Sequence, residues 1–339
     1  MDDFVFGEDD VVAVDVHREV QQALRYGRAV VALESALITA GMPRTTSRNL
    51  GLCLPDSAAP GWDERQPINL QVARLLERTV RDAGAIPATV GIIDGVLRIG
   101  LDGEALVRLA EDTPAPPASA RDLAYVMGRG NTAGTTVSAT LRSCRLPQDG
   151  PIRVLATGGI GGVHREWTTR PDISADLRQL ATTPVCVVAS GAKSILDVPA
   201  TAEALETLGV PVIAFGTDRF PRFYCLGSDE LPAPARLDSA AAVAKLCRTH
   251  WETLGCSSGL LLANPVPMPD GLDPAEISRV VAEADQEAAR KGITSTARTP
   301  YLLGAVLEKT GSRSLTANLA LLVSNARLAA DVAGTLAGR

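Results

Sequence analysis

Short apolar runs alternate along the chain with segments whose apolar residues recur at helical spacing. Runs of this kind, bounded by turn residues, are typical of buried strands, and the longer periodic segments are typical of helices that cover a sheet. The pattern predicts an α/β fold with three layers, α/β/α, and a largely parallel central sheet. Strands are expected at 29–33, 87–93, 153–156, 185–189, 210–215 and 259–263, and helices at 68–83, 201–208, 239–253, 274–291, 300–310 and from 314 to the C-terminus.

Residues 1–339 are predicted to form a single α/β domain, because no change in composition separates two halves. Two stretches interrupt the periodic pattern. Residues 50–67 are rich in proline, glycine and polar side chains, and residues 112–119 consist mostly of proline and alanine. Such compositions favour loops over helices or strands. We therefore expect two loop excursions from the surface of one domain.

Composition and charge indicate a cytoplasmic globular enzyme or binding protein. The formal net charge is −6 and no basic cluster is present, which argues against a nucleic acid polymer as partner. The acidic N-terminus lacks the features of a secretion signal, and no apolar run reaches membrane-spanning length, so no membrane association is expected. Six cysteines without metal-ligand spacing are best explained as reduced thiols.

Lys193 is the first lysine of a chain that otherwise uses arginine for most of its positive charges. Only four of the 33 basic residues are lysines, and Lys193 follows the apolar run 184–192. A lysine amine can lose its proton and attack a carbonyl to form an imine, which an arginine cannot do. Burial in apolar surroundings favours the neutral amine. Lys193 is thus a candidate nucleophile; the alternative is a lysine that ends a strand with its ammonium in solvent.

Glu34 directly follows the predicted strand 29–33 and precedes the turn 41–43. Open α/β sheets build their sites at the carboxyl ends of strands. A glutamate at the end of an apolar strand is expected to have a raised pKa and to act as a general acid or base. In isolation, a role in capping a helix or turn is an equally good interpretation.

A glycine-rich segment, ATGGIGGVHR at 156–165, follows the predicted strand 153–156. Its glycines would let backbone amides approach a phosphate or an oxyanion closely. The spacing differs from the dinucleotide-binding pattern, and no acidic residue follows at the required distance. The alternative is a tight turn without a ligand.

Asp172, Ser174 and Asp176 bring two carboxylates and a hydroxyl together within five residues. Such a cluster suits a hard divalent cation held partly through water, or the hydroxyl groups of a sugar. On pattern alone, capping by Ser174 or Asp172 of a helix that begins near Ala175 is the stronger interpretation.

The order and spacing of several segments resemble the pseudouridine-5'-phosphate glycosidase family, which also contains relatives from indigoidine-type gene clusters. The resemblance covers about residues 25–330. Its most specific segments are TGGIGGVHR, DISADL and GAKSILD. The matching segments are ALES (32–35), GMP (41–43), GTTVSAT (134–140), ATGGIGGVHR (156–165), DISADL (172–177), GAKSILD (191–197), GVPVI (209–213), ANPVP (263–267), TPYLL (299–303) and SLTAN (314–318).

The resemblance implies reversible cleavage of a carbon–carbon glycosidic bond, with ribose 5-phosphate and an aglycone as small-molecule partners. Ribose C1 would be held as an imine on Lys193, and Glu34 would move the proton for ring opening and closing. Asp172 would hold Mn²⁺, or another divalent cation, largely through waters. Asn318 would read the uracil edge, and relatives of this kind form homotrimers. The further substrate contacts expected are Val137, Thr157, His164, Ser174, Ala175 and Asp176.

Departures from the family pattern cluster around the expected pocket. Pro117 stands where most members carry a substrate-contacting lysine, and Arg121 is a candidate to replace its charge. Ala40 replaces a histidine, and Trp167 adds an aromatic side chain close in sequence to Asp172. These changes leave Glu34, Asp172 and Lys193 intact.

The pattern of retained and altered residues favours a C-glycosynthase of natural-product biosynthesis that joins ribose 5-phosphate to an aglycone other than uracil. The first alternative is a pseudouridine-5'-phosphate glycosidase, since Asn318 is present. Further alternatives are a class I aldolase-like lyase that uses the same lysine and a non-catalytic homologue that binds a sugar phosphate.

Overall fold

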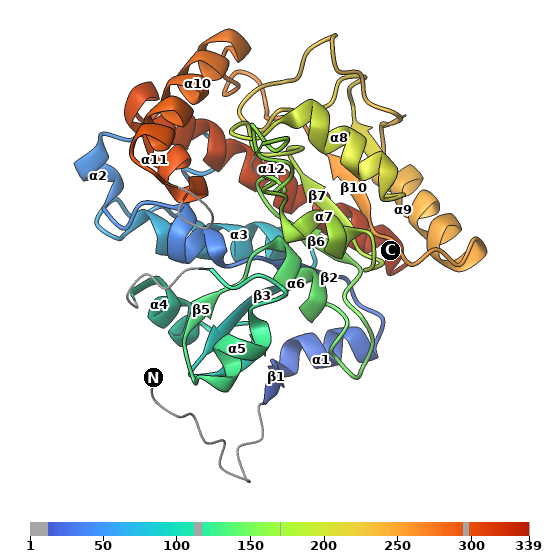
Figure 1. Ribbon diagram of the computed structural model, residues 1–339. Helices are drawn as coiled ribbons and strands as arrows, with labels where there is room; N and C mark the ends of the chain where they lie inside the picture. The colour runs from blue at the N-terminus through green and yellow to red at the C-terminus, as the bar shows by residue number, and fades with distance from the viewer. Residues whose placement is uncertain (1–12, 112–116, 170, 294–297, 339) are drawn as a thin grey trace.

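The computed structural model describes residues 13–111, 117–169, 171–293 and 298–338. Its centre is a ten-stranded sheet with the strand order β1-β4-β3-β2-β6-β7-β10-β8-β9, and β5 pairs with β3 (Figure 1). Only the β3–β4 and β3–β5 pairs are antiparallel, so the prediction of a largely parallel α/β sheet is confirmed. The strands are β1 (Val14–Val16), β2 (Val30–Leu33), β3 (Ile86–Ile93), β4 (Val96–Ile99), β5 (Ala133–Gly134), β6 (Val154–Ala156), β7 (Cys186–Ala189), β8 (Val212–Phe215), β9 (Arg236–Leu237) and β10 (Leu260–Ala263).

All six predicted strands are present, and each is buried along nearly its whole length. Strands covered by helices on both faces are continuous apolar runs, which is why the pattern identified them. The strands that the pattern missed are β1, β4, β5 and β9. These strands have two to four residues each and lie toward the two edges of the sheet or off its main path.

Helices cover both faces of the sheet. The six predicted helices are all present, and α10 is capped by Asp273, which accepts a hydrogen bond from the Glu276 N–H over 2.8 Å. Helices α3 and α9 both pack on α12, which lies against β2, β6 and β7. The helices are α1 (Arg18–Arg25), α2 (Ser47–Leu50), α3 (Ile68–Asp82), α4 (Gly103–Glu111), α5 (Leu123–Gly128), α6 (Val137–Ser143), α7 (Ala175–Leu180), α8 (Val198–Thr207), α9 (Ala240–Arg248), α10 (Pro274–Arg290), α11 (Arg298–Thr310) and α12 (Arg313–Leu336), with π-helical turns at Leu37–Gly41 and Thr249–Thr253.

The order of the strands reverses direction between β2 and β6. From β2 the chain crosses through α3 to β3 on one side, whereas β6 leads through α7 to β7 on the other. Right-handed crossovers in opposite directions place α3 and α7 on opposite faces of the sheet. A crevice therefore opens at the carboxyl ends of β2 and β6, which is where open α/β sheets bind their ligands.

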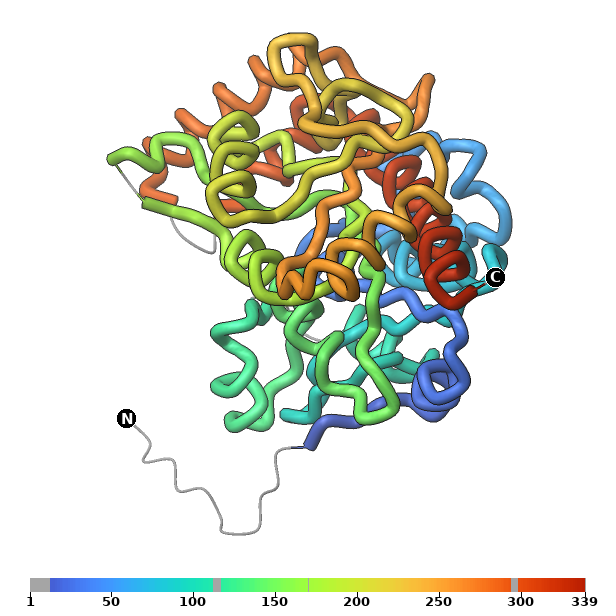
Figure 2. Tube along the Cα trace, turned by 90° about the vertical axis from the view of Figure 1, so that its right-hand side faces the viewer, coloured from blue at the N-terminus to red at the C-terminus, as the bar shows by residue number. Residues whose placement is uncertain are grey.

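The long helix α12 passes behind the central strands in Figure 1, and its red tube ends near the right-hand edge of the view in Figure 2. It is long and apolar enough to span a membrane by length and composition, but most of it is buried inside the protein. Its Asn325 donates hydrogen bonds to the carbonyl of Thr157 over 2.8 Å and to Ser190 Oγ over 3.2 Å. The helix is thus fixed to the chain just beyond the ends of β6 and β7.

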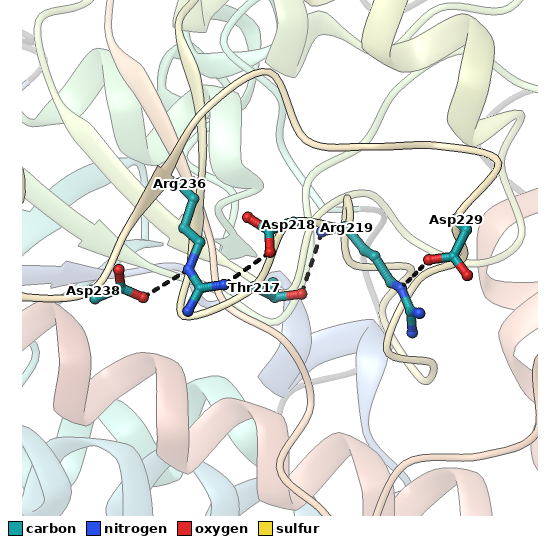
Figure 3. Close-up of polar contacts among 6 residues, drawn as sticks. All are labelled: Thr217, Asp218, Arg219, Asp229, Arg236 and Asp238. Atoms are coloured by element: carbon teal, nitrogen blue, oxygen red, sulfur yellow. Dashed lines mark hydrogen bonds and ion pairs between the residues drawn. The ribbon is translucent and has the colours of Figure 1, made fainter.

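A long excursion, residues 216–235, separates β8 from β9. Arginine–aspartate pairs close it (Figure 3): Arg236 binds Asp218 over 2.9 Å and Asp238 over 2.8 Å, and Arg219 binds Asp229 over 2.7 Å. These pairs are largely exposed, so each contributes little to stability. The pairs hold together the two ends of this segment, and Phe223, which lies within it, is buried.

The two predicted loop excursions have different outcomes. Of the predicted excursion 50–67, residues 51–67 form turns and extended segments without regular helix or strand, whereas Leu50 is the last residue of α2. Of the stretch 112–119, residues 112–116 lie outside the described residues. Ala118 pairs with the segment at β5, where its N–H donates to the Gly134 carbonyl over 2.8 Å. All six cysteines are free in the structure.

Candidate active site

A cavity of about 380 Å³ opens at the carboxyl ends of β2, β6 and β7. The residues that line it include two groups. We call Glu34, Asp176 and Lys193 the inner wall, because Glu34 and Lys193 follow β2 and β7 and Asp176 binds the segment after β6. We call the group from segments outside the sheet the outer wall, which consists of Pro117, Arg121, Thr299, Pro300 and Leu303.

Glu34 is buried at the end of β2 and is 6% exposed. Its carboxylate accepts a short hydrogen bond from the hydroxyl of Thr157, the residue that directly follows β6. Burial raises the pKa of Glu34 above its ordinary value, although the positive charge of Lys193 and the Thr157 hydrogen bond oppose this change. The raised pKa agrees with the sequence prediction for this position. A raised pKa lets a glutamate hold a proton that it can give to a reacting group, as a general acid does.

Lys193 is held at the cavity by a sharp turn after β7. Gly191 has a φ of +70°, and a Cβ there would lie 2.0 Å from the carbonyl oxygen of Pro221, so only glycine fits. The Lys193 N–H donates to the Ile160 carbonyl over 3.1 Å. Within the described residues, its side-chain amine makes no hydrogen bond or ion pair, and it is partly buried in the cavity lining. The amine is therefore directed to the cavity without being engaged elsewhere.

Asp176 joins three segments of the inner wall. One carboxylate oxygen accepts from the Ser138 N–H and the other from the Gly161 N–H, both over 2.8 Å. Asp176 is 5% exposed, so its charge is stabilised mainly by these backbone donors. The carboxylate thus fixes the start of α6 and the glycine-rich segment relative to α7.

The glycine-rich segment at 158–162 serves close packing. None of its glycines has a positive φ, so a tight turn is not the reason that glycine is needed at these positions. A Cβ at Gly161 would lie 2.3 Å from Ser174 Oγ, and one at Gly159 would lie 2.6 Å from the Phe223 ring. The amide of Gly161 does approach an anion closely, as the glycine pattern predicted, but that anion is the chain's own Asp176.

Ser174 caps α7, because its side chain accepts a hydrogen bond from the Asp176 N–H over 3.2 Å. The capping interpretation of this motif is therefore confirmed for Ser174. Ser174 also lines the cavity, so capping does not exclude a contact with substrate.

Asp172 and His164 lie close together at one end of the cavity. The His164 N–H donates to the Asp172 carbonyl over 3.0 Å, and both side chains line the cavity. Burial lowers the pKa of His164, while the charge of Asp172 opposes this change. The described residues contain no group of three side chains able to hold a metal ion. A divalent cation at Asp172 would consequently take most of its ligands from water and substrate, as Mg²⁺ and Mn²⁺ commonly do.

The outer wall is assembled from two separate segments. Pro117 and Arg121 come from the stretch before α5, and Arg121 Nε lies 3.3 Å from Asp122. The start of α11 supplies the rest, and it is held by a buried pair between Arg298 and Asp285 of α10 over 2.7 Å. Trp167, which the sequence placed close to Asp172, is 40% exposed and does not line the cavity.

Asn318 of α12 lies at the end of the cavity where the aromatic ring of Phe223 also enters. A Cβ at Gly158 would lie 3.2 Å from that ring and 3.5 Å from the Asn318 amide oxygen, so the two side chains are neighbours. Phe223 has a φ of +58°, which is unusual for a bulky residue and is found at functional sites. Sequence reasoning missed Phe223, because neither its backbone conformation nor its contact with residues 158–159 leaves a local signal.

The structure brings the predicted site residues together. Thr157 does not reach the cavity itself; it lies behind Glu34 and positions it. The others all line the cavity, namely Glu34, Val137, His164, Asp172, Ser174, Ala175, Asp176, Lys193 and Asn318.

With this geometry established, comparison with known proteins defines the class of protein. The family described as "Indigoidine synthase A like protein" matches residues 64–335. Pseudouridine-5'-phosphate glycosidase of Paracoccus denitrificans is 47% identical over 322 residues, covering 94% of this chain and 97% of the relative. That of Dinoroseobacter shibae is 45% identical over 323 residues, covering 95% and 97%. The chain belongs to the indigoidine synthase A-like family, as the resemblance predicted.

Two solved structures share the fold over nearly the whole chain. A prealnumycin C-glycosynthase, solved in complex with ribulose 5-phosphate, superposes with a TM-score of 0.80 at 35% identity, covering 96% of this chain and 97% of that one. An indigoidine synthase A-like protein from Thermotoga maritima gives a TM-score of 0.78 at 30% identity, covering 98% and 100%. The family thus includes proteins named for cleaving a C-glycosidic bond and one named for forming it.

Proposed function

We propose that this protein is a pseudouridine-5'-phosphate glycosidase, which interconverts pseudouridine 5'-phosphate plus water with uracil plus ribose 5-phosphate. The observation that carries the proposal is the inner wall: within the described residues, the Lys193 amine has no hydrogen-bond or ion-pair partner, and it lines the cavity together with the buried Glu34, whose pKa is raised. The names of the similar relatives favour this reaction over the C-glycosynthase that the sequence departures first suggested.

In the cleavage direction, Glu34 donates a proton to the ring oxygen as the bond between that oxygen and C1' breaks. The Lys193 amine forms a bond to C1', and Glu34 takes up the proton that the resulting ammonium loses. Glu34 then protonates the uracil carbon that is bonded to C1'. The bond between this carbon and C1' breaks, its electron pair restores the double bond of the uracil ring, and the nitrogen lone pair turns the C1'–nitrogen bond into a protonated imine; uracil is released, and the carboxylate of Glu34 regains its proton in the hydrolysis that follows. Water adds to the imine and frees ribose 5-phosphate, which restores the lysine.

The remaining inner-wall contacts keep the two reacting groups in register. Thr157 directs the Glu34 carboxyl toward the cavity, because its hydroxyl holds one oxygen. The Asp176 carboxylate binds the backbone of both α6 and the glycine-rich segment, and Val137 at the start of α6 lines the cavity. Orientation of this kind lowers the entropic part of the barrier.

A divalent cation, Mn²⁺ in the first instance, is proposed to bind at Asp172. Within the described residues, the Asp172 carboxylate makes no hydrogen bond or ion pair, and it faces the cavity, so its oxygens are available as ligands. The cation would supply positive charge that neutralises the substrate phosphate. His164 beside it, kept neutral by burial, can donate to or accept from the substrate.

The aglycone end of the cavity is proposed to lie between Phe223 and Asn318. The amide of Asn318 carries a donor and an acceptor, which together match the edge of a uracil ring. The Phe223 ring lies beside it and offers an apolar face on which a flat base can pack. A planar heterocycle with a polar edge is therefore the aglycone that these two side chains favour.

A second candidate is C-glycosynthesis with an aglycone other than uracil. One observation favours it: Pro117, which replaces the lysine expected from the family pattern, lines the cavity and removes a positive charge from the outer wall. The structural similarity to the prealnumycin C-glycosynthase agrees with this candidate. Arg121 on the same wall is the cation placed to bind the phosphate instead.

Incubation with uracil, ribose 5-phosphate and Mn²⁺ tests the aglycone directly. Formation of pseudouridine 5'-phosphate, detected by mass spectrometry, is the expected result. If borohydride reduction attaches ribitol phosphate to the Lys193 peptide while no pseudouridine 5'-phosphate forms, the C-glycosynthase candidate replaces the first. Absence of the ribitol label contradicts imine chemistry altogether and leaves the sugar-phosphate-binding homologue.

The same assay distinguishes an aldolase-like lyase from the two candidates above, since such an enzyme would form the lysine adduct without making a C-nucleoside.

A homotrimer also stays a prediction, and light scattering of the purified protein measures it. The trimer predicts a mass about three times the 35.4 kDa of the chain.

A further inference from the structure

A second cavity of about 270 Å³ lies behind the catalytic one, at the N-terminal ends of α8 and α10. Leu196 contributes to the lining of both cavities. Arg165 and Ser194 line the second cavity, and each directly follows a residue of the catalytic cavity, His164 and Lys193. The two cavities therefore lie on opposite sides of the same two backbone segments.

Two arginines from distant segments converge in this second cavity. Arg165 follows the glycine-rich segment, and Arg222 comes from the excursion between β8 and β9. The Nε atoms of both are buried without a hydrogen-bond partner. Within the described residues, neither guanidinium takes part in a hydrogen bond or an ion pair. Burying a charged donor without a partner is costly, so this arrangement needs an explanation.

The polar groups around the two arginines are already engaged. Asp197 is the one acidic residue among the residues that line this cavity, and its carboxylate accepts from the Ala200 N–H over 3.0 Å, which caps α8. The Ser194 hydroxyl donates to the Arg222 carbonyl over 2.6 Å. Neither group binds the buried Nε atoms, and among the lining residues the two guanidinium charges exceed the single carboxylate charge of Asp197.

We propose that Arg165 and Arg222 form a second, non-catalytic site that binds an oxyanion of phosphate type. Guanidinium groups bind phosphate through paired hydrogen bonds in fixed geometry, and two of them converging on one cavity suit a tetrahedral dianion. A volume of about 270 Å³ accommodates either free phosphate or the head of a small phosphomonoester. The proposal rests on this cavity alone and is independent of the reaction proposed for Lys193.

Crystals soaked in tungstate, a phosphate analogue that scatters anomalously, test the site in the unaltered protein. Anomalous density between Arg165 and Arg222 is the expected result. Density only in the catalytic cavity, or none, overturns the proposal. This test needs no substitution, so it stands even where a variant fails to fold.

Calorimetric titration with inorganic phosphate supplies the solution test. Arg222→Gln and the double variant Arg165→Gln/Arg222→Gln are expected to weaken the binding at this site at least about tenfold, because each loses a charge-assisted pair. The matched control is Arg25→Gln, which removes an exposed arginine that pairs with Asp149 on the surface. Equal affinity in the double variant and the control contradicts the proposal.

A parallel titration with glycerol 3-phosphate distinguishes the two sources of the oxyanion. Tighter binding of the ester than of phosphate assigns the site to a phosphomonoester, and the reverse assigns it to the free ion. In both cases the binding must depend on the two arginines.

Discussion

The two walls of the catalytic cavity are constructed in different ways. The inner wall is fixed by backbone hydrogen bonds: Asp176 accepts from two amides, and Lys193 follows a turn that only glycine allows. The outer wall consists of segments outside the sheet, where Arg121 pairs, among the described residues, with the carboxylate of its neighbour Asp122. The start of α11 is held by the buried pair between Arg298 and Asp285 and by packing of the helix on α10 and α12.

This difference separates the residues proposed to carry out the reaction, which lie on the inner wall, from residues of the outer wall proposed to contact the substrate. Displacing any inner-wall residue disturbs strands that are buried on both faces, so the positions of the reacting groups are tied to the fold itself. An outer-wall side chain can be exchanged without breaking a strand or an amide contact. One departure from the family pattern agrees with this division, because Pro117 lies on the outer wall whereas Glu34 and Lys193 are present; Ala40, a second departure, lines the cavity outside the two walls.

The largest effect is expected from the nucleophile. Lys193→Ala should lower turnover at least about a thousandfold and abolish borohydride-dependent labelling, because no other group can form the imine. Lys193→Arg should be equally inactive, since it keeps the charge but not the nucleophilic amine. Lys245→Ala on the exposed face of α9 is the matched control and should behave as wild type. Turnover retained in Lys193→Ala would contradict the proposed mechanism.

Glu34→Gln should lower turnover about a hundredfold or more, which is the usual contribution of a general acid or base. The same substitution has a predictable effect on stability. Because the pKa of Glu34 is raised in the folded state, the unfolded chain ionises first as pH rises above about 4.3, and wild-type stability falls until the raised pKa is passed.

A neutral glutamine removes this loss of stability. The difference in melting temperature, Glu34→Gln minus wild type, should therefore be larger and more positive at about pH 8 than at about pH 5. Differential scanning calorimetry at both pH values measures it. A difference in melting temperature that is independent of pH would show that the carboxyl group is not held at a raised pKa.

Asp176→Asn tests the connection between α6, α7 and the glycine-rich segment. Asparagine keeps one acceptor oxygen but replaces the other with a donor that faces the N–H of Ser138 or Gly161. We expect a loss of about 2 to 3 kcal/mol in the free energy of unfolding and a fall of about tenfold in kcat. Denaturant titration and steady-state kinetics measure the two effects. Unchanged stability would mean that the carboxylate does not carry the contacts described.

The smallest effect is expected on the outer wall. Pro117→Lys restores a positive charge to the cavity and should lower the KM for the sugar phosphate by up to about tenfold, with little change in kcat. Pro117→Ala is the control for loss of the proline ring. If the lysine variant changes kcat instead of KM, the division between the two walls is wrong.

The fold was largely predictable because its central strands are continuous apolar runs. Strands β1, β4, β5 and β9 escaped detection, because β5 and β9 have two residues each, and β1 and β4 include a charged residue and are partly exposed, so they are not continuous apolar runs. At the site, Glu34 and Lys193 were found by their position after predicted strands. The hydrogen bond from Thr157 to Glu34 spans 123 positions of sequence, so nothing local to either residue reveals it.

The same reason explains which functional residues were missed. Phe223 lines the cavity from a long excursion and adopts a positive φ, which the residues next to it in sequence do not predict. Arg298 and Asp285 meet because α10 and α11 pack against each other, which is a tertiary event. Sequence patterns report what a residue's neighbours along the chain require, whereas these contacts are decided by elements that meet only after folding.

The attachment of α12 has a consequence for altering the substrate range. Asn325 ties the helix to residues just beyond β6 and β7, and Asn318 lies seven positions earlier on the same rigid rod, an axial rise of about 10 Å. The distance along α12 between Asn325 and Asn318, the side chain proposed to bind the base, is thus set by helix geometry and does not adapt to a longer aglycone. Exchanging the side chain at 318 should change which base edge is bound. Inserting one residue between 318 and 325 should rotate that side chain by about 100° around the helix axis, away from the cavity.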